Sequence, residues 1–148
     1  MRHGVGQPCT ILRTSMKLLH QIVGIVVVII FLLTGQYMEF YYPRMDEVDD
    51  GVRMMLRSRH IYILLAGLVN IGVGSYFSYR KKLWRRILQG IGSTLIIIAP
   101  SLLIIAFFYE PRLANLQRTL TLPGIVSLFT GALCHLLSGA WQTRSPAS

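Results

Sequence analysis

Four long apolar segments, separated by short polar ones, dominate the pattern of this 148-residue chain. The most sharply bounded lies between Arg59 and Arg80, and its roughly twenty residues without a charged side chain would form about 30 Å of α-helix. That length matches the hydrocarbon thickness of a bilayer, and the other three segments are comparable. The pattern therefore predicts an all-α membrane protein with four transmembrane helices, at residues 18–38, 60–79, 87–108 and 120–141.

The remaining segments are short and polar, so they are predicted to be tails and connections of one membrane domain. Residues 1–16 show no periodicity that would bury a face, which predicts a loose or surface-lying polar tail on the cytoplasmic side. A second cytoplasmic tail is expected at 143–148, leaving a single four-helix domain at 17–142. Within the first connection, hydrophobic residues recur at helical spacing over 44–58, which predicts a short surface helix that can lead directly into the second span.

The amino-acid composition supports a membrane protein and argues against a soluble domain. Hydrophobic residues make up 53% of the chain, and the mean hydropathy is +0.52. Charged residues make up only 14%, whereas an ordinary soluble domain has about a quarter. The whole chain is therefore expected to form one unit embedded in the bilayer.

The net charge of +9 is concentrated on one side of the predicted membrane. Segments before the first span, between the second and third, and after the fourth contain this whole excess, whereas the opposite connections carry nearly equal numbers of acids and bases. The positive-inside rule then predicts an up-down four-transmembrane-helix bundle with both termini cytoplasmic, as in a bacterial inner membrane. The basic face is expected to contact anionic lipids, and nucleic-acid binding is not predicted.

Helices in lipid associate through close packing of small residues and through hydrogen bonds between helices. The fourth predicted span has small residues along one face, spaced alternately by three and four, and the second span has a shorter series. Asn70, near the middle of the second span, needs a hydrogen-bond partner there; a contact between helices is the interpretation, with a ligand or ion contact as the alternative. The predicted packing residues are Gly67, Gly74, Gly124, Ser127, Gly131 and Ser138.

Three histidines are the candidates for chemistry. His20 in the first span and His135 in the fourth lie at similar predicted depths, so the two rings could ligate the iron of a haem b. His60 adjoins Arg57 and Arg59 at the other edge of the bundle, a combination that suits a quinone headgroup or a lipid phosphate. The alternative for all three rings is structural, through hydrogen bonding within the bundle or anchoring at the interface.

Motifs for other kinds of chemistry are missing from the sequence. No acidic residue lies within a predicted span, which counts against proton-coupled transport. The chain has no C-x-x-C, no glycine-rich phosphate loop, no H-E-x-x-H and no nucleophile elbow, and the acids of the first connection lack the spacing of a calcium loop. No catalytic or metal-binding residue is therefore predicted.

The interpretations that remain belong to different functional classes. The first is a non-enzymatic membrane protein that serves as a subunit or scaffold, binding another membrane protein or a second copy of itself. The second is a redox component that binds haem b through His20 and His135, or a quinone near His60. A small-solute transporter, with Asn70 and Pro100 along a polar path, ranks third.

Overall fold

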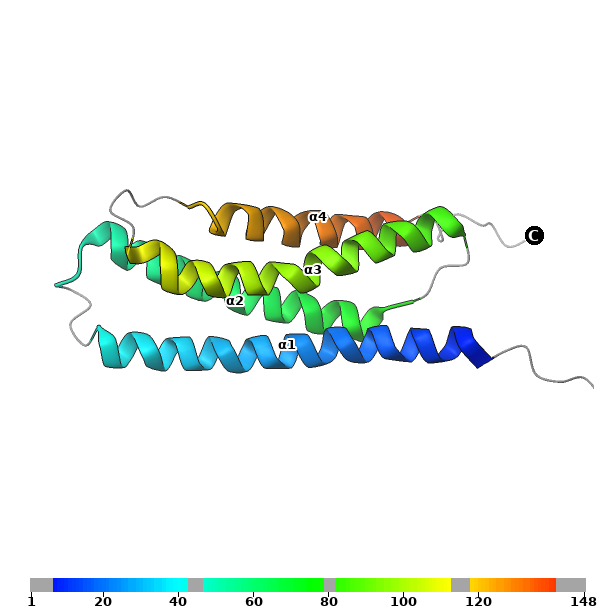
Figure 1. The fold of residues 1–148 in the computed structure, drawn as a ribbon, viewed down its shortest axis with the longest axis horizontal. Coiled ribbons are helices and arrows are strands. Elements are labelled where there is room, and N and C mark those ends of the chain that lie inside the picture. The colour runs from blue at the N-terminus through cyan, green and yellow to red at the C-terminus, as the bar shows by residue number, and fades with distance from the viewer. Residues whose placement is uncertain (1–6, 43–46, 79–81, 113–117, 141–148) are drawn as a thin grey trace, which may run out of the picture.

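The four helices of the computed structural model run alternately up and down (Figure 1). We call the end that contains the starts of α1 and α3 and the ends of α2 and α4 the terminal end, and the opposite one the loop end. The predicted tail 143–148 lies outside the described residues, which are 7–42, 47–78, 82–112 and 118–140. The helices are α1 (Gln7–Tyr41), α2 (Asp50–Tyr76), α3 (Leu83–Tyr109) and α4 (Thr121–Ala140), and a 3-10 helix, η1 (Glu110–Arg112), follows α3.

Three of the four helices are long and apolar enough to cross a membrane, which confirms the prediction of a helical membrane protein. These segments are Ser15–Tyr41, Leu83–Tyr109 and Thr121–Gly139. Helix α2 is as long as α3, with 27 residues. It is the more polar of the two because its first turns contain three arginines and a histidine. The segment between Arg59 and Arg80, which has the sharpest boundaries in the sequence, thus belongs to α2, and the composition of α2 does not by itself qualify it as a membrane span.

The structure differs from the prediction at the start of α1 and agrees with it where the first connection leads into α2. Helix α1 already begins at Gln7, inside the segment 1–16 that is predicted to be a tail. Helix α2 runs without a break from Asp50 to Tyr76, so the later part of the predicted surface helix 44–58 leads directly into the predicted span 60–79, and no proline interrupts the segment. Asp49 caps its start, and one carboxylate oxygen accepts hydrogen bonds from two backbone N–H groups of the first turn at 2.9 and 3.4 Å.

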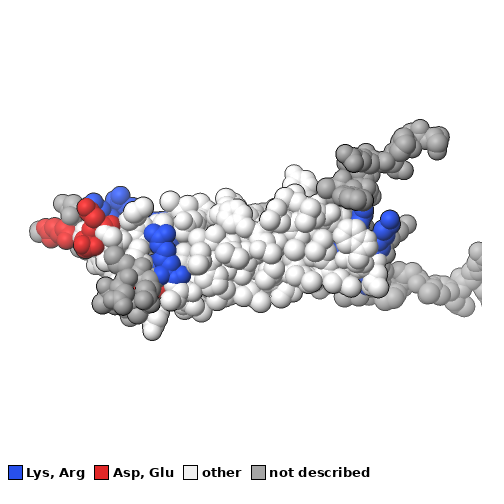
Figure 2. Space-filling view, turned by 90° about the horizontal axis from the view of Figure 1, so that it is seen from above, with Lys and Arg blue, Asp and Glu red and all other residues white. Residues whose placement is uncertain are grey.

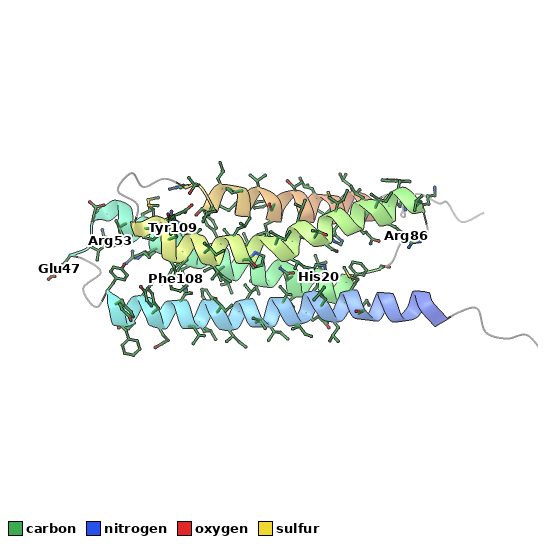
Figure 3. All side chains as sticks on the ribbon, in the orientation of Figure 1. His20, Glu47, Arg53, Arg86, Phe108 and Tyr109 are labelled. Carbon is green, nitrogen blue, oxygen red and sulfur yellow. The ribbon has the colours of Figure 1, made fainter. Side chains whose placement is uncertain are left out.

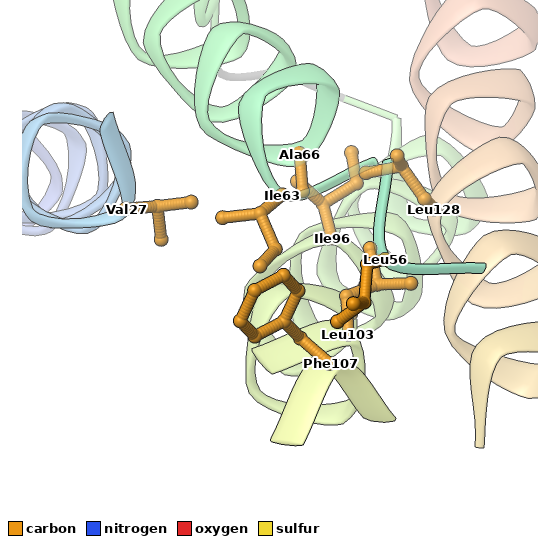
Figure 4. Packing of buried hydrophobic residues seen from close by; sticks show 9 residues of the cluster. Val27, Leu56, Ile63, Ala66, Ile96, Leu103, Phe107 and Leu128 are labelled. Atoms are coloured by element: carbon orange, nitrogen blue, oxygen red, sulfur yellow. The ribbon is translucent and has the colours of Figure 1, made fainter. Parts of the chain in front are cut away.

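The helices form two pairs, α1 with α2 and α3 with α4, and α2 and α3 make the main contact between the pairs (Figure 1). Ile63 and Ala66 of α2 and Ile96 of α3 are completely buried in this central contact. Val27 of α1 and Leu128 of α4 reach the same hydrophobic core from the two outer helices (Figure 4). The core is therefore centred on α2 and α3, which explains why the more polar α2 lies inside the bundle.

Glycines bring the backbones of each helix pair into contact. A Cβ added at Gly24 would lie 2.6 Å from the Cγ1 of Ile71 and 2.9 Å from the carbonyl oxygen of Gly67. In the other pair, a Cβ at Gly131 would lie 2.7 Å from the carbonyl oxygen of Gly92. No side chain larger than hydrogen fits these positions without moving a helix. Of the predicted packing residues, Gly67, Gly74, Gly124, Gly131 and Ser138 are buried and Ser127 is half-buried.

Charged residues gather at the two ends and leave an uncharged band between them (Figure 2). At the terminal end the described charged residues are all basic, and every described acidic residue lies at the loop end together with several arginines. The terminal end has Lys17, Lys82, Arg85 and Arg86; the loop end has Glu39, Glu47, Asp49, Asp50, Arg53, Arg57, Arg59, Glu110 and Arg118.

Candidate functional site

Four polar side chains, one from each helix, meet in the interior of the bundle. They are His20 of α1, Asn70 of α2, Ser93 of α3 and His135 of α4, and we call them the histidine cluster. His20 and Asn70 are completely buried, and Ser93 is 1% exposed. Figure 3 places His20 in the half of the bundle nearer to Arg86, so the cluster lies toward the terminal end.

The packing glycines position this cluster. Each of its four members lies within four residues of a glycine at which two helix backbones touch, so each polar side chain is at most about one helical turn from a close contact. Because the helices approach so closely there, short side chains such as serine and asparagine reach across to the next helix. The glycines concerned are Gly24, Gly67, Gly92 and Gly131.

Asn70 sets the direction of the hydrogen bonds in the cluster. Its amide nitrogen donates to the carbonyl oxygens of Ala66 at 2.9 Å and Ile96 at 3.1 Å, so its Oδ1 must face His20. The Nδ1–H of His20 donates to that oxygen at 3.0 Å. With no carboxylate in contact among the described residues, the buried ring is neutral and its Nε2 is a bare acceptor.

The hydrogen bonds of Ser93 determine the protonation of the second histidine, His135. The hydroxyl of Ser93 donates to Nε2 of His20 at 3.0 Å, so its oxygen accepts the Nε2–H of His135 at 3.1 Å. Neutral His135 therefore has its proton on Nε2, and its Nδ1 is bare. The ring of Phe77 lies beside both imidazoles, with centroids 6.2 Å from His20 and 5.8 Å from His135. A one-directional chain of hydrogen bonds thus links all four helices.

A pocket of about 640 Å³ lies next to His135 at the terminal end. It is bordered by the end of α2, the start of α3 and the second half of α4, and we call it the α2–α4 pocket. Tyr76 and Leu136, on its two sides, are 89% and 66% exposed, so the pocket opens at the flank of the bundle between α2 and α4. His135 is the member of the histidine cluster that lines it.

A second buried polar site lies at the loop end, where Arg59 of α2 forms an ion pair with Glu110 of η1. The distance from Nη2 to Oε2 is 2.5 Å, and the two side chains are 1% and 0% exposed. The hydroxyl of Thr121 joins them, since it accepts from Nε of Arg59 at 3.0 Å and donates to Oε2 of Glu110 at 2.5 Å. Nη1 of Arg59 has no hydrogen-bond partner among the residues that the structure describes. We call these three residues the arginine–glutamate site.

Glu110 also caps helix α4. Its Oε1 accepts the backbone N–H groups of Leu120 at 2.6 Å and Thr121 at 3.0 Å, where the helix dipole favours a negative charge. Burial raises the pKa of Glu110, but the hydrogen bonds from Thr121 and Leu120 and the charge of Arg59 outweigh it, so the pKa lies below its usual value. The ionised carboxylate therefore links α2, the end of α3 and the start of α4.

The structure does not bring together Arg57, Arg59 and His60, the residues of the predicted quinone or phosphate site. Successive residues of a helix point about 100° apart, so the three side chains leave α2 in different directions. Arg57 is exposed and Arg59 enters the arginine–glutamate site. His60 turns to α1, where its Nδ1 contacts the hydroxyl of Thr34 at 3.0 Å and its ring stacks on Phe31 with centroids 4.1 Å apart.

The structure brings His20 and His135 together, but not in an arrangement that fits a haem. Their ring centroids are 6.2 Å apart, and the hydroxyl of Ser93 bonds to both rings. A bis-histidine haem needs an iron and the plane of a macrocycle between the two rings, and Ser93 occupies that place. Both ring nitrogens of His20 are already hydrogen-bonded inside the protein. The contacts instead tie the helices to one another.

Ser93 and Glu110 belong to these two sites, but they are not predicted from the sequence as site residues. Ser93 follows Gln89 by four positions, and both are buried, whereas Thr94 next to it is exposed. The four-residue spacing of two polar residues in an apolar helix is the sequence feature that could have indicated Ser93. For Glu110 the sequence gives a weaker indication, because an acidic residue at a helix end is expected to be exposed to solvent. Its burial can be predicted only when its distant partner, Arg59, is known.

Ser93→Ala should destabilise the bundle by about 1–2 kcal/mol, because it leaves one nitrogen of His20 and one N–H of His135 without a partner. Ser75→Ala is the matched control, since exposed Ser75 donates only to the Ile71 carbonyl of its own helix. Unfolding of both variants in mixed micelles, followed by circular dichroism, gives the comparison. Equal stabilities would show that the cluster contributes nothing to the fold.

The chain matches no protein-family model, no curated protein sequence and no solved structure. What it does must follow from its own geometry. That geometry consists of a membrane-length bundle, two buried polar sites at different depths, and a pocket that opens at the flank.

Proposed function

We propose that this chain is a non-enzymatic integral membrane protein with four transmembrane helices, a small subunit or scaffold that binds another membrane protein or a second copy of itself. The bonding of most of its buried polar groups to one another supports this role most directly. His20, Asn70 and Ser93 bond to one another, and Arg59 and Glu110 form an ion pair. These groups hold helices together and are not presented to a substrate.

The orientation of its side chains supports α2 as a fourth span despite its composition. Arg59 and Asn70 are turned inward, at 1% and 0% exposed. The outward positions Met54, Ile61 and Leu68 recur every seven residues, and each is more than half exposed. A helix that buries its polar residues against its neighbours and shows apolar ones outward is suited to lipid. Helix α2 therefore crosses the bilayer with the other three.

The distribution of charge supports a cytoplasmic terminal end. The described charged residues there are all basic, whereas the acidic residues lie at the loop end (Figure 2). By the positive-inside rule both termini lie in the cytoplasm, as expected for a bacterial inner membrane. The basic end also suits contact with anionic lipid headgroups.

The two alternative functions fit the described side chains less well. Between His20 and His135, the hydroxyl of Ser93 bonds to both rings at the place that a haem would need. Transport through the middle of the bundle would need Asn70 to face a passage, but Asn70 is completely buried and bonds to three groups in helices α1, α2 and α3. A partner-binding role requires no such passage.

Helix α1 offers the surface for such a partner. It packs along α2 and touches α3 only slightly, so most of its circumference is free of the other helices. Ile25 and Ile29 lie on this free face, 55% and 50% exposed. A second transmembrane helix can pack there through van der Waals contacts.

Extraction from native membranes in a mild detergent, followed by native electrophoresis, should reveal a complex larger than one chain. Ile25→Trp combined with Ile29→Trp should reduce its amount several-fold, because the larger rings disturb packing on the free face of α1. Phe129→Trp on the outer face of α4, where Phe129 is 56% exposed, should leave the complex intact. A single chain in all samples, including chemically cross-linked membranes, would contradict the proposed role.

A further inference from the structure

The bare nitrogen of His135 gives the α2–α4 pocket a chemical preference. Asn70 fixes the protonation of His20, Ser93 passes this constraint to His135, and the result is that Nδ1 of His135 carries no proton. His135 lines the pocket, and among the described residues its one side-chain hydrogen bond is that of Nε2 to Ser93. An unprotonated Nδ1 on a residue that lines the pocket is an acceptor that a ligand can satisfy with a donor such as a hydroxyl group.

We propose that the α2–α4 pocket binds a membrane-soluble amphiphile that has a hydroxyl group on an apolar body, and that Nδ1 of His135 accepts the hydrogen bond of that hydroxyl. An isoprenoid hydroquinone and a diacylglycerol share this chemistry. The proposal rests on the membrane location of the bundle and not on its role as a subunit.

The size and walls of the pocket suit such a molecule. Its volume of about 640 Å³ lies within the range of about 300–1,000 Å³ that is usual for small-molecule sites. Val73, Phe77 and Leu136 supply apolar walls. The hydroxyl of Ser138, which also lines the pocket, donates to the carbonyl oxygen of His135 in its own helix. A largely apolar pocket with an accessible acceptor favours an apolar ligand with one polar group.

The position of the pocket gives the ligand a route from the bilayer. Its mouth lies at the flank of the bundle between α2 and α4, which touch each other only slightly. Gln89 in its wall lies one helical turn inside Arg85 of the basic terminal end. A lipid amphiphile at that depth has its polar group near the interface and its apolar body in the hydrocarbon, so it can enter sideways.

Gly72 offers a way to close the pocket without disturbing the fold. It lines the pocket, and a Cβ added there would meet no atom within 4 Å. Gly72→Leu should therefore fill the pocket while the helices keep their packing. Gly90→Leu is the matched control, because a Cβ at Gly90 also meets nothing within 4 Å and Gly90 does not line the pocket.

The test measures binding to the full chain in phosphatidylcholine nanodiscs by equilibrium dialysis. The probes are a short-chain ubiquinol, its dimethyl ether and dioctanoylglycerol. At least one hydroxyl probe should bind, and the ether should bind about tenfold more weakly than the quinol if the quinol is the ligand, as expected for one lost hydrogen bond. The relative affinities of the quinol and the glyceride identify the preferred apolar body.

The variants decide where the probe binds. His135→Phe and Gly72→Leu should each weaken binding by about tenfold or more, and Gly90→Leu should leave it unchanged. Melting temperatures of all variants separate loss of binding from loss of folding. If neither hydroxyl probe binds, or if His135→Phe binds as tightly as the unaltered chain, the proposal is overturned. The native electrophoresis of the α1 variants is independent, so failure here leaves the subunit role standing.

Discussion

Replacing Glu110 by alanine should destabilise the folded protein by about 3–5 kcal/mol, because it leaves the buried charge of Arg59 without a partner. The same change removes the cap of α4, since Glu110 accepts the backbone N–H groups of Leu120 and Thr121. Unfolding in mixed micelles, followed by circular dichroism, measures the loss. Glu39→Ala is the control for a change of charge, because Glu39 is exposed near the same end.

The double variant Arg59→Met with Glu110→Leu should recover much of this stability, because apolar side chains of similar size replace both charges at once. Full recovery is not expected, since α4 still lacks its cap. A destabilisation by Glu110→Ala no larger than that of Glu39→Ala would show that the ion pair does not hold the helices together.

Acid should weaken the fold through the same carboxylate. The pKa of Glu110 in the folded protein lies below that of an unfolded glutamate, so the ionised group stabilises the fold above the unfolded pKa. This stabilisation is lost as the pH falls through the lower, folded-state pKa. Glu110→Gln should lack that part of the acid sensitivity, and unfolding curves at several pH values below neutrality compare the two proteins.

Gly131→Ala should destabilise the bundle by about 1–3 kcal/mol, because helices α3 and α4 must move apart to admit the methyl group. Its Cβ would lie 2.7 Å from both the carbonyl oxygen of Gly92 and the Cγ1 of Ile96. The control is Gly90→Ala, two residues before Gly92 and therefore about 200° away around α3, on the exposed face, where a Cβ meets nothing within 4 Å.

That control should stabilise the protein by up to about 1 kcal/mol, because alanine is the better helix former in a helix interior. The pair of variants therefore separates close packing from helix propensity in the same helix pair, and unfolding in mixed micelles measures both. Equal effects of Gly131→Ala and Gly90→Ala would show that the approach of α3 to α4 at Gly131 is not important for stability.

The membrane class and the four helices could be predicted from the sequence because long apolar runs admit few other structures. For α2 the sequence left open whether the predicted surface helix 44–58 is separate from the span 60–79 or leads directly into it, and the structure has one helix from Asp50 to Tyr76. Only the three-dimensional contact with Glu110 explains why a charged residue continues inside the bundle. Composition alone therefore underestimates the ability of a helix to span the membrane when its polar side chains are bonded to other helices.

The candidate sites were less predictable than the helices. That Asn70 needs a partner follows from its position in an apolar segment, but the identity of that partner does not. His20 lies 50 positions away from Asn70, and Ser93 lies 73 positions away from His20. Which residues meet depends on how far the helices slide along one another, and glycine contacts such as Gly24 against Gly67 set that register.

The ion pair of Arg59 and Glu110 joins the two halves of the chain, and the halves differ in how far their buried charges are satisfied before the whole chain is made. The first half, α1 with α2, leaves the ribosome with a guanidinium whose counter-ion has not yet been synthesised. The second half, α3 with α4, contains both the carboxylate and the N–H groups that it caps. Before the second half is made, the guanidinium of Arg59 has no carboxylate to pair with, whereas the carboxylate of Glu110 already has the N–H groups of α4. Burial of Arg59 in the bilayer is therefore expected to follow the synthesis of the second half.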